Sequence, residues 1–210
     1  MTLPNIGIIG RLRSGKDTVA AYLAEKYGYT QFAFGDELKR YAHELFGEPA
    51  PGTKPRELYQ WFGQAMRERD PDVWVRKCLD NVAEGEAQTV VACEMLRIMG
   101  EYVSEEERRF HAVVTDCRQQ NEYAALQSAG YVLIRVEAPE SLRIHRAIES
   151  GDTFNLRDLT HGTETALDGY AADFTVKNDA GLPELYAQID EIMAYLALGR
   201  DADALGGVSP

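Results

Sequence analysis

The sequence predicts a three-layer α/β fold, with about five parallel strands in one sheet and helices on both of its faces. Short apolar runs alternate with helical patterns along the chain, which is typical of parallel strands joined by helical crossovers. The first run also leads through a glycine–lysine loop directly into a helical pattern. The runs that predict strands are residues 6–9, 31–34, 113–115, 132–137 and 174–177.

The bulk composition limits the function classes. A chain of 210 residues, of which 45% are hydrophobic, can bury one full core. Its 34 acidic residues outnumber the 22 basic ones, and the net charge of −12 disfavours nucleic acid and anionic membranes as partners. The three cysteines form no CxxC pair, and the sequence has no hydrophobic leader and no apolar run of ~18 residues. We therefore expect a reduced, cytoplasmic protein.

The stretch IGIIGRLRSGKDTVAAYLAEKYG (residues 6–28) has the pattern of a strand, a phosphate-binding loop and a helix. Gly10, Gly15 and Lys16 have the spacing of such a loop, whose glycines let backbone N–H groups approach phosphate oxygens while the lysine neutralises their charge. Arg11 and Arg13 place two more positive charges in the same loop. The sequence therefore predicts a phosphate site here.

One position departs from the usual loop pattern, in which a Ser or Thr directly after the lysine binds Mg²⁺. This chain has Asp17 there, and the hydroxyl comes one residue later, at Thr18. A carboxylate beside phosphate groups is tolerable where Mg²⁺ organises the site. We hypothesise that Asp17 binds Mg²⁺ directly or through water, with Thr18 as its hydroxyl partner.

Residues 54–79 combine arginines with aromatic side chains on a helical pattern. A guanidinium group pairs bidentately with a phosphate, and an aromatic ring stacks on a base, so this segment suits a nucleotide acceptor. In the alternative interpretation it is an ordinary amphipathic helix whose tryptophans face the core. Both interpretations stay open for Arg56, Arg67, Arg69, Arg76, Trp61, Phe62 and Trp74.

The motif VVTDCRQQNE (residues 113–122) places Asp116 and Arg118 at the end of the third predicted strand. Ligands of open α/β sheets bind at the carboxyl ends of the strands. Asp116 could hold the Mg²⁺ shell or the incoming substrate, and Arg118 could reach a phosphate or a base edge.

Two segments interrupt the alternation of strands and helices. Residues 89–110 start like a strand and continue into a polar helical pattern, and it stays open whether residues 90–93 join the sheet. Within residues 143–164 the helical spacing of apolar residues is lost. Such an irregular segment between two strands is typical of a lid. We expect one domain over residues 1–196, with an acceptor-binding lobe at about 36–85, a lid at about 141–165 and a flexible tail at 197–210.

Four motifs carry a family resemblance: SGKDT (residues 14–18), TDCRQQNE (115–122), HGTETALDG (161–169) and FTVKNDAGLPELYAQID (174–190). Together they resemble the deoxynucleoside monophosphate kinases of bacteriophages and their bacterial relatives, over nearly the whole chain. The resemblance implies a P-loop kinase fold, ATP and Mg²⁺ as cofactors, and phosphoryl transfer to a nucleoside monophosphate. This sequence departs from the family pattern at Asn178-Asp179-Ala180-Gly181, which is one residue longer than the usual asparagine–aspartate–glycine turn.

The resemblance also implies roles for individual residues. Those expected to bind the donor nucleotide are Gly10, Arg13, Ser14, Gly15, Lys16, Asp17, Thr18, Asn178 and Asp179, the last two beside the adenine. Those expected on the acceptor side are Asp36, Lys39, Arg56, Trp61, Asp116, Arg118 and Glu164. The expected catalytic residues are Lys16, Arg11, Arg118 and Arg146, with Arg143, Arg146 and Arg157 as lid guanidinium groups; the expected metal ligands are Asp17, Thr18 and Asp116.

The expected chemistry needs no general base, because the second pKa of an acceptor phosphate is about 6 and its oxygen is largely ionised at neutral pH. The enzyme must align donor and acceptor, spread positive charge and exclude water. Two alternatives stay open: a P-loop kinase for another acceptor, such as dephospho-coenzyme A, phosphomevalonate or a modified-base hydroxyl, and a regulatory nucleotide-binding protein without acceptor. Association into a homodimer is a further expectation.

Overall fold

The computed structural model describes residues 3–53, 55–105, 107–149 and 166–199. The chain divides into two compact units, one formed by residues 1–31 and 109–210 and the other by residues 32–108. The first unit contains the phosphate loop, and the second contains the residues expected to form an acceptor-binding lobe. That these units work as lobes of one kinase domain stays a prediction.

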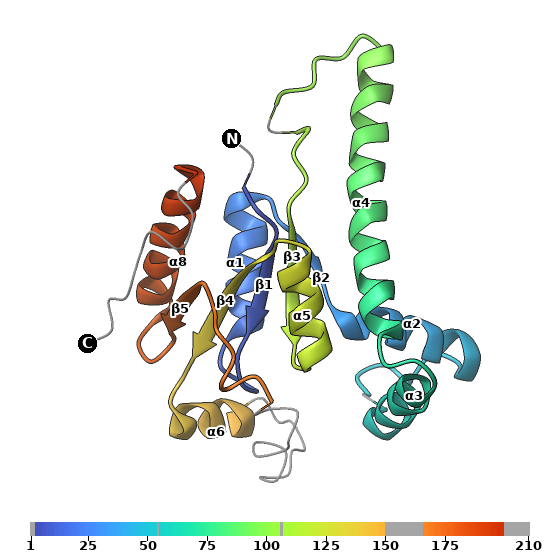
Figure 1. Cartoon of the computed structure of the whole chain (residues 1–210), viewed down its shortest axis with the longest axis vertical. Coiled ribbons are helices and arrows are strands. Elements are labelled where there is room, and N and C mark those ends of the chain that lie inside the picture. The colour runs from blue at the N-terminus through green and yellow to red at the C-terminus, as the bar shows by residue number, and fades with distance from the viewer. Residues whose placement is uncertain (1–2, 54, 106, 150–165, 200–210) are drawn as a thin grey trace. The chain divides into compact units, whose positions relative to one another are not determined.

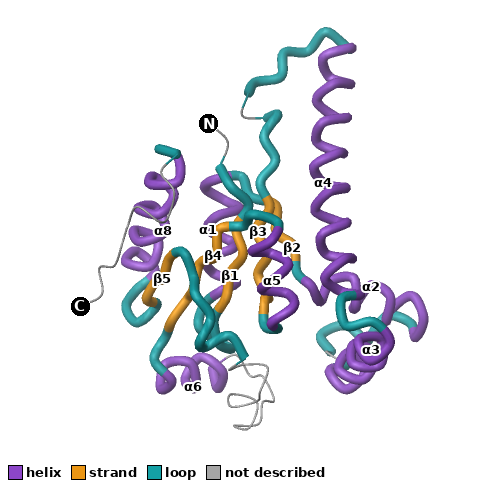
Figure 2. Tube along the Cα trace, viewed as in Figure 1, coloured by secondary structure: helices purple, strands orange, loops and turns teal. Residues whose placement is uncertain are grey.

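Five strands form one sheet in the described part of the chain, in the order β2 (Thr30–Phe32), β3 (Ala112–Cys117), β1 (Ile6–Ile9), β4 (Val132–Glu137) and β5 (Phe174–Lys177). The pairs β1–β3, β1–β4 and β4–β5 are parallel. Figure 1 and Figure 2 show the strands side by side with helices around them. The predicted fold class is confirmed.

Three of the predicted strands, β1, β4 and β5, match the structure residue for residue. The prediction for residues 31–34 is wrong at its end, because Phe34 begins helix α2 (Phe34–Phe46) and is buried there. An apolar residue at a strand–helix junction serves either element, so periodicity cannot assign it. Strand β3 is longer than predicted and includes Asp116.

Helices α1 (Lys16–Tyr27) and α8 (Leu182–Ala197) cover one face of the sheet. Their apolar side chains form one buried cluster with those of alternate strand residues, among them Ile6, Ile8 and Ile134. On the other face, Gly7 lies under helix α5 (Gln120–Ser128): a Cβ atom there would come within 2.8 Å of Leu126 Cδ1 and 2.7 Å of Leu133 Cδ2. The sheet is therefore the middle of three layers, and the P-loop is carried by its central strand.

The packing of α1 against α8 includes a polar cluster around Asp190. Its carboxylate accepts hydrogen bonds from Tyr22 Oη (2.8 Å), Tyr27 Oη (2.7 Å) and Lys26 Nζ (2.7 Å). The hydrogen bond from Lys26 is the main cause that lowers the pKa of Asp190 below its ordinary value. The cluster ties the helix that starts at the phosphate loop to the last described helix.

The second unit contains α2, α3 (Arg56–Arg69) and α4 (Val73–Ile98). Phe62 and Trp74 belong to its buried core, and Trp74 Nε1 donates to the Gly63 carbonyl oxygen at 3.3 Å. Trp61, in contrast, is 59% exposed. The amphipathic interpretation therefore holds for Phe62 and Trp74, and Trp61 remains a candidate to meet a ligand.

Residues 90–93 lie inside α4 and do not join the sheet. Val90 and Val91 are exposed on this helix, so their β-branched run reflects neither a strand nor a core face. The helix ends at Ile98, and Gly100 adopts a positive φ of 84°. The expected helical pattern beyond this point is wrong for the described residues up to 110.

Helix α6 (Glu140–Glu149) is the described part of the segment expected to form a lid. Residues 150–165 and the expected tail from residue 200 onward lie outside the described residues. Among the described residues, no helix combines the length and apolar character needed to cross a membrane.

Candidate nucleotide site

The backbone of the phosphate loop (residues 10–15) is fixed by close contacts. Gly10 and Gly15 have φ values of 149° and 106°. A Cβ atom on Gly10 would lie 2.5 Å from the Val136 carbonyl oxygen, and one on Gly15 would lie 2.1 Å from Asn178 Nδ2. Arg13, with φ 62°, is the one positive-φ residue other than glycine in the described chain. The loop therefore requires glycine at both predicted positions and tolerates a strained residue between them.

Lys16 lies across its own loop. Its side chain is buried, and Nζ donates to the carbonyl oxygens of Gly10 (2.7 Å) and Arg11 (3.1 Å). Ser14 is also buried, and its Oγ has no hydrogen-bond partner among the described residues. A buried hydroxyl without a partner is uncommon in folded proteins. The loop thus combines a buried cation with an unmet hydrogen-bonding group, which suits a phosphate oxygen.

Asn178 and Arg146 hold the loop from the side of β5 and α6. Asn178 Nδ2 donates to the Ser14 carbonyl oxygen at 2.8 Å, and Asn178 Oδ1 accepts from Arg146 Nη2 at 3.0 Å. Arg146 Nη1 lies 3.4 Å from the carbonyl oxygens of Arg13 and Ser14. The resemblance implied that Asn178 lies beside the adenine; in the structure its buried side chain contacts the loop backbone.

A second arginine of α6 reaches the loop, and an arginine of the loop itself reaches an aspartate. Arg143, on α6, is 2% exposed, and its Nη1 donates to the Leu12 carbonyl oxygen at 3.3 Å. Arg11 pairs bidentately with Asp168: Nε lies 3.0 Å from Oδ1 and Nη2 lies 2.5 Å from Oδ2. The Arg11 guanidinium is the main cause that lowers the pKa of Asp168 below its ordinary value.

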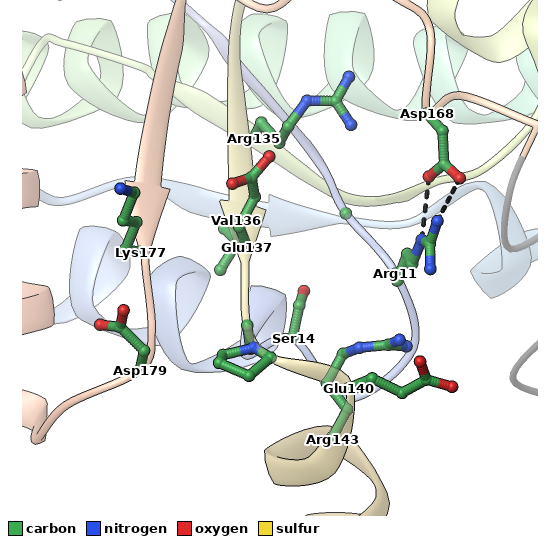
Figure 3. A pocket seen from close by; sticks show the side chains of 13 residues that line it. Arg11, Ser14, Arg135, Val136, Glu137, Glu140, Arg143, Asp168, Lys177 and Asp179 are labelled. Carbon is green, nitrogen blue, oxygen red and sulfur yellow. Dashed lines mark hydrogen bonds and ion pairs between the residues drawn. The ribbon is translucent and has the colours of Figure 1, made fainter. Parts of the chain in front are cut away.

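A cavity of about 530 Å³ opens beside the loop, at the carboxyl ends of β1, β4 and β5 (Figure 3). This volume is typical of small-molecule sites. Four basic and four acidic side chains line it. Its charged lining residues are Arg11, Arg135, Arg143, Lys177, Glu137, Glu140, Asp168 and Asp179.

Arg118 lies beside the loop, and Asp116 stands two residues before it in β3. Residue Ile9 of β1 pairs with Cys117 of β3, so the carboxyl end of β3 adjoins the start of the phosphate loop. Arg118 lines a small hollow together with Arg11 and Asp168. The backbone N–H of Arg118 donates to Glu122 Oε2 at 2.8 Å. This contact fixes the turn that presents Arg118.

That Asp17 binds Mg²⁺ stays a hypothesis, but the structure gives another reason why a carboxylate is tolerated at this position. Asp17 is exposed in the first turn of α1, where the helix dipole stabilises a negative charge. Asp17, Thr18 and Asp116 offer the oxygen donors that Mg²⁺ prefers, and Mg²⁺ takes its remaining ligands from water and substrate phosphates. The described residues contain no cluster of three His, Cys, Asp or Glu side chains suited to a metal.

The residues expected on the acceptor side lie mostly in the second unit. Asp36 and Lys39 form a half-exposed ion pair of 3.3 Å on α2, and Arg56 is the first residue of α3. Trp61 packs edge-to-face with Phe46, with ring centroids 5.9 Å apart. Their role in acceptor binding stays a prediction. Arg157 and Glu164 lie outside the described residues.

Sequence reasoning missed Asp168, Arg135 and Glu122. Asp168 lies inside the motif HGTETALDG, which indicated the family without singling out this residue. Arg135 is a charged residue inside a β-branched strand, an exception to the apolar pattern that signals a polar partner. Glu122 stands three residues after Gln119, the spacing of a helix capping box.

The fold and this site define the chain as a protein of the P-loop kinase class. Among solved structures it is similar to a gluconokinase from Sinorhizobium meliloti 1021 (TM-score 0.51, 19% identity, covering 98% of this chain and 97% of the other). It is also similar to a sugar kinase from Janibacter sp. HTCC2649 (TM-score 0.50, 13% identity, covering 95% and 98%). At these identities the likeness concerns the fold.

In sequence, the chain is 28% identical over 194 residues to a protein of Acanthamoeba polyphaga mimivirus described as "Putative deoxynucleotide monophosphate kinase". The match covers 88% of this chain and 93% of that protein. No family model matches the chain. The resemblance expected from the four motifs is confirmed, and with it the kinase class.

Proposed function

We propose that this protein transfers the γ-phosphoryl group of ATP, with Mg²⁺, to a deoxynucleoside monophosphate, giving ADP and the nucleoside diphosphate. The observation that carries the proposal is the phosphate loop, in which Lys16 and the unpartnered Ser14 hydroxyl are buried beside a cavity lined by Arg11 and Arg143. The acceptor class is supported by the name of the viral relative.

The acceptor supplies its own nucleophile. A phosphate monoester oxygen is largely ionised at neutral pH, so the site has to align two anions and stabilise the charge on the transferred group. When bound, Mg²⁺ neutralises part of the charge on the donor phosphates. Lys16 gives up its present hydrogen bonds to loop carbonyl oxygens and binds the same phosphates. Ser14 donates its hydroxyl hydrogen to a phosphate oxygen.

The arginines divide into two groups by their contacts. Arg143 and Arg146 donate to the loop backbone, so in this arrangement they hold the loop in shape. Arg11 lines the cavity, as Arg143 also does, and Arg118 lines the small hollow beside it. In this proposal Arg11 and Arg118 meet the phosphates. Asp36, Lys39, Arg56 and Trp61 of the second unit bind the acceptor in this proposal.

The proposal also covers the setting in which the protein works. Its cysteines, Cys78, Cys93 and Cys117, are free thiols, as is usual in a reducing compartment, which supports a cytoplasmic location. Association into a homodimer stays a prediction, and the molar mass of the purified protein in solution tests it.

The first test is ADP production from ATP and Mg²⁺ with each of the eight common ribo- and deoxyribonucleoside monophosphates, against a reaction without acceptor. We expect strong stimulation by one or more deoxynucleotides, and their ranking gives the base preference. If none of them stimulates ADP production although ATP still binds, the proposal of a nucleoside monophosphate acceptor is refuted. The remaining alternatives are then another small acceptor or a regulatory role.

A matched pair of lysine variants tests the loop. Lys16→Ala should lower turnover by roughly 100-fold or more, because it removes a charge that stabilises the transition state. Lys26→Ala, on the same helix, removes a lysine that contacts Asp190 and Tyr22 but not the loop. It should lower thermal stability and leave turnover near that of the wild type. Equal turnover in the two variants would contradict the assignment of Lys16.

A further inference from the structure

The turn at residues 166–170 is anchored to the sheet. Arg135, from β4, donates through Nη2 to the carbonyl oxygens of Leu167 (3.0 Å) and Tyr170 (2.6 Å). The Leu167 side chain is buried. Two hydrogen bonds from one guanidinium group to two carbonyls fix the course of the turn, because they constrain its backbone at both ends.

A second element holds the same turn. Tyr123, on α5, donates its hydroxyl to the Ala171 carbonyl oxygen at 2.9 Å, and its ring packs edge-to-face on Tyr170 with centroids 4.8 Å apart. The Tyr123 hydroxyl is a hydrogen-bond donor at neutral pH, and burial raises its pKa further above the ordinary value. None of these contacts uses the side chain of Asp168.

The side chain of Asp168 instead faces the phosphate loop, and Figure 3 shows its carboxylate meeting the Arg11 guanidinium. A bidentate pair fixes the plane of the guanidinium group as well as its position. The backbone of Arg11 is fixed too, since its carbonyl oxygen accepts from Lys16 Nζ (3.1 Å) and from the Ser14 N–H (3.1 Å). Both Arg11 and Asp168 line the cavity, with side chains about two-fifths exposed (43% and 39%).

We propose that Asp168 is a positioning residue: it orients the Arg11 guanidinium toward the phosphates of the bound nucleotide and so links the turn before β5 to the phosphate loop. The inference rests on the proposed function. An unrestrained arginine side chain loses rotamer entropy when it binds a phosphate. Orienting Arg11 before the nucleotide arrives removes part of that cost from binding and from the transition state.

A purely electrostatic role predicts the opposite outcome. Arg11, Arg135 and Arg143 all act on the Asp168 carboxylate through their charges, so removing that negative charge makes the cavity more positive. If Asp168 mattered only by its charge, Asp168→Asn would bind a nucleotide phosphate more tightly. If it positions Arg11, the same variant binds and reacts less well.

The experiment is a double-mutant cycle with Arg11→Ala, Asp168→Asn and the combined variant. It measures kcat and KM for ATP, and the Kd of the ATP analogue AMPPNP with Mg²⁺. We expect Asp168→Asn to lower kcat/KM by about 10- to 100-fold, as misplaced catalytic groups do, and to raise the Kd. In the Arg11→Ala background the same change should have no further effect. Asp168→Glu, which keeps the charge, should recover part of the loss.

Asp173→Asn is the matched control. Asp173 stands near the same turn, and its Oδ2 accepts from the backbone N–H of Leu133 at 2.6 Å, so its loss should lower the melting temperature without coupling to Arg11. Equal effects of Asp168→Asn with and without Arg11, or a lower Kd in Asp168→Asn, would overturn the inference. If the wild type shows no acceptor-dependent turnover, the proposed function fails, and the cycle on the AMPPNP Kd alone decides about Asp168.

Discussion

Gly15→Ala tests the geometry of the phosphate loop most directly. Gly15 is the N-cap of α1 with φ 106°, and a Cβ atom there would lie 2.1 Å from Asn178 Nδ2. Alanine at a left-handed φ costs roughly 1–2 kcal/mol. The clash also displaces the buried Asn178 amide, whose bond to the Ser14 carbonyl oxygen is then lost, for about another 1–3 kcal/mol. The expected loss of unfolding free energy is about 3 kcal/mol.

Gly28→Ala is the internal control, because Gly28 is the C-cap of the same helix. Its φ is 72°, and a Cβ atom there would meet nothing within 4 Å. Gly28→Ala should therefore lower the unfolding free energy only by the cost of alanine at a left-handed φ, about 1–2 kcal/mol. The measurement is the unfolding free energy from urea titration, together with the Kd of the ATP analogue, which only Gly15→Ala should raise.

A third variant isolates the clash. In an Asn178→Ala background the methyl group at residue 15 has space, so Gly15→Ala should cost no more than Gly28→Ala does. The reasoning would be refuted if the two glycine variants lost equal stability in the wild type, or if Gly15→Ala cost the same with and without the Asn178 amide.

Two further predictions concern the acceptor and pH. Arg118→Ala should raise the KM of the acceptor with little change in the KM of ATP, and unchanged acceptor kinetics would show that this side of the site is misplaced. Asp190→Asn should lower the unfolding free energy at pH 7 by about 1 kcal/mol, because the amide loses the ion pair with Lys26 and accepts only neutral hydrogen bonds from the two tyrosines. Since folding lowers the pKa of Asp190, its stabilisation is present above the ordinary value of 3.8 and is lost as the pH falls through the folded value. The difference between variant and wild type, followed by denaturation at several pH values, should therefore shrink at acid pH, and a constant difference would contradict the assignment.

The sequence carried enough information for the sheet and the phosphate loop because both are local patterns. Residues 132–137 and 174–177 are β-branched runs with breaks on both sides, and the structure has strands at these positions. The two loop glycines could be predicted from their spacing relative to Lys16. The run at 90–93 also begins with two β-branched residues, yet it is helical, and Val90 and Val91 are exposed. Whether such a run forms a strand or a helix depends on its burial, and burial is not a local property of the sequence.

The contacts that shape the site join residues far apart in the chain. Arg11 and Asp168 are 157 positions apart, and Ser14 and Asn178 are 164 apart. They meet because β1 stands between β3 and β4, with β5 beyond β4, so the loop after β1 lies at the point where the strand order reverses. If this strand order is known, the sequence predicts that Asp116 and Arg118 reach the loop from one side and that α6 reaches it from the other. It would not predict Asp168 or Asn178, because each must reach past β4, and the turn that carries Asp168 is set by Arg135 and Tyr123. Sequence analysis therefore missed Asp168 because its place depends on side-chain contacts from a neighbouring strand and helix.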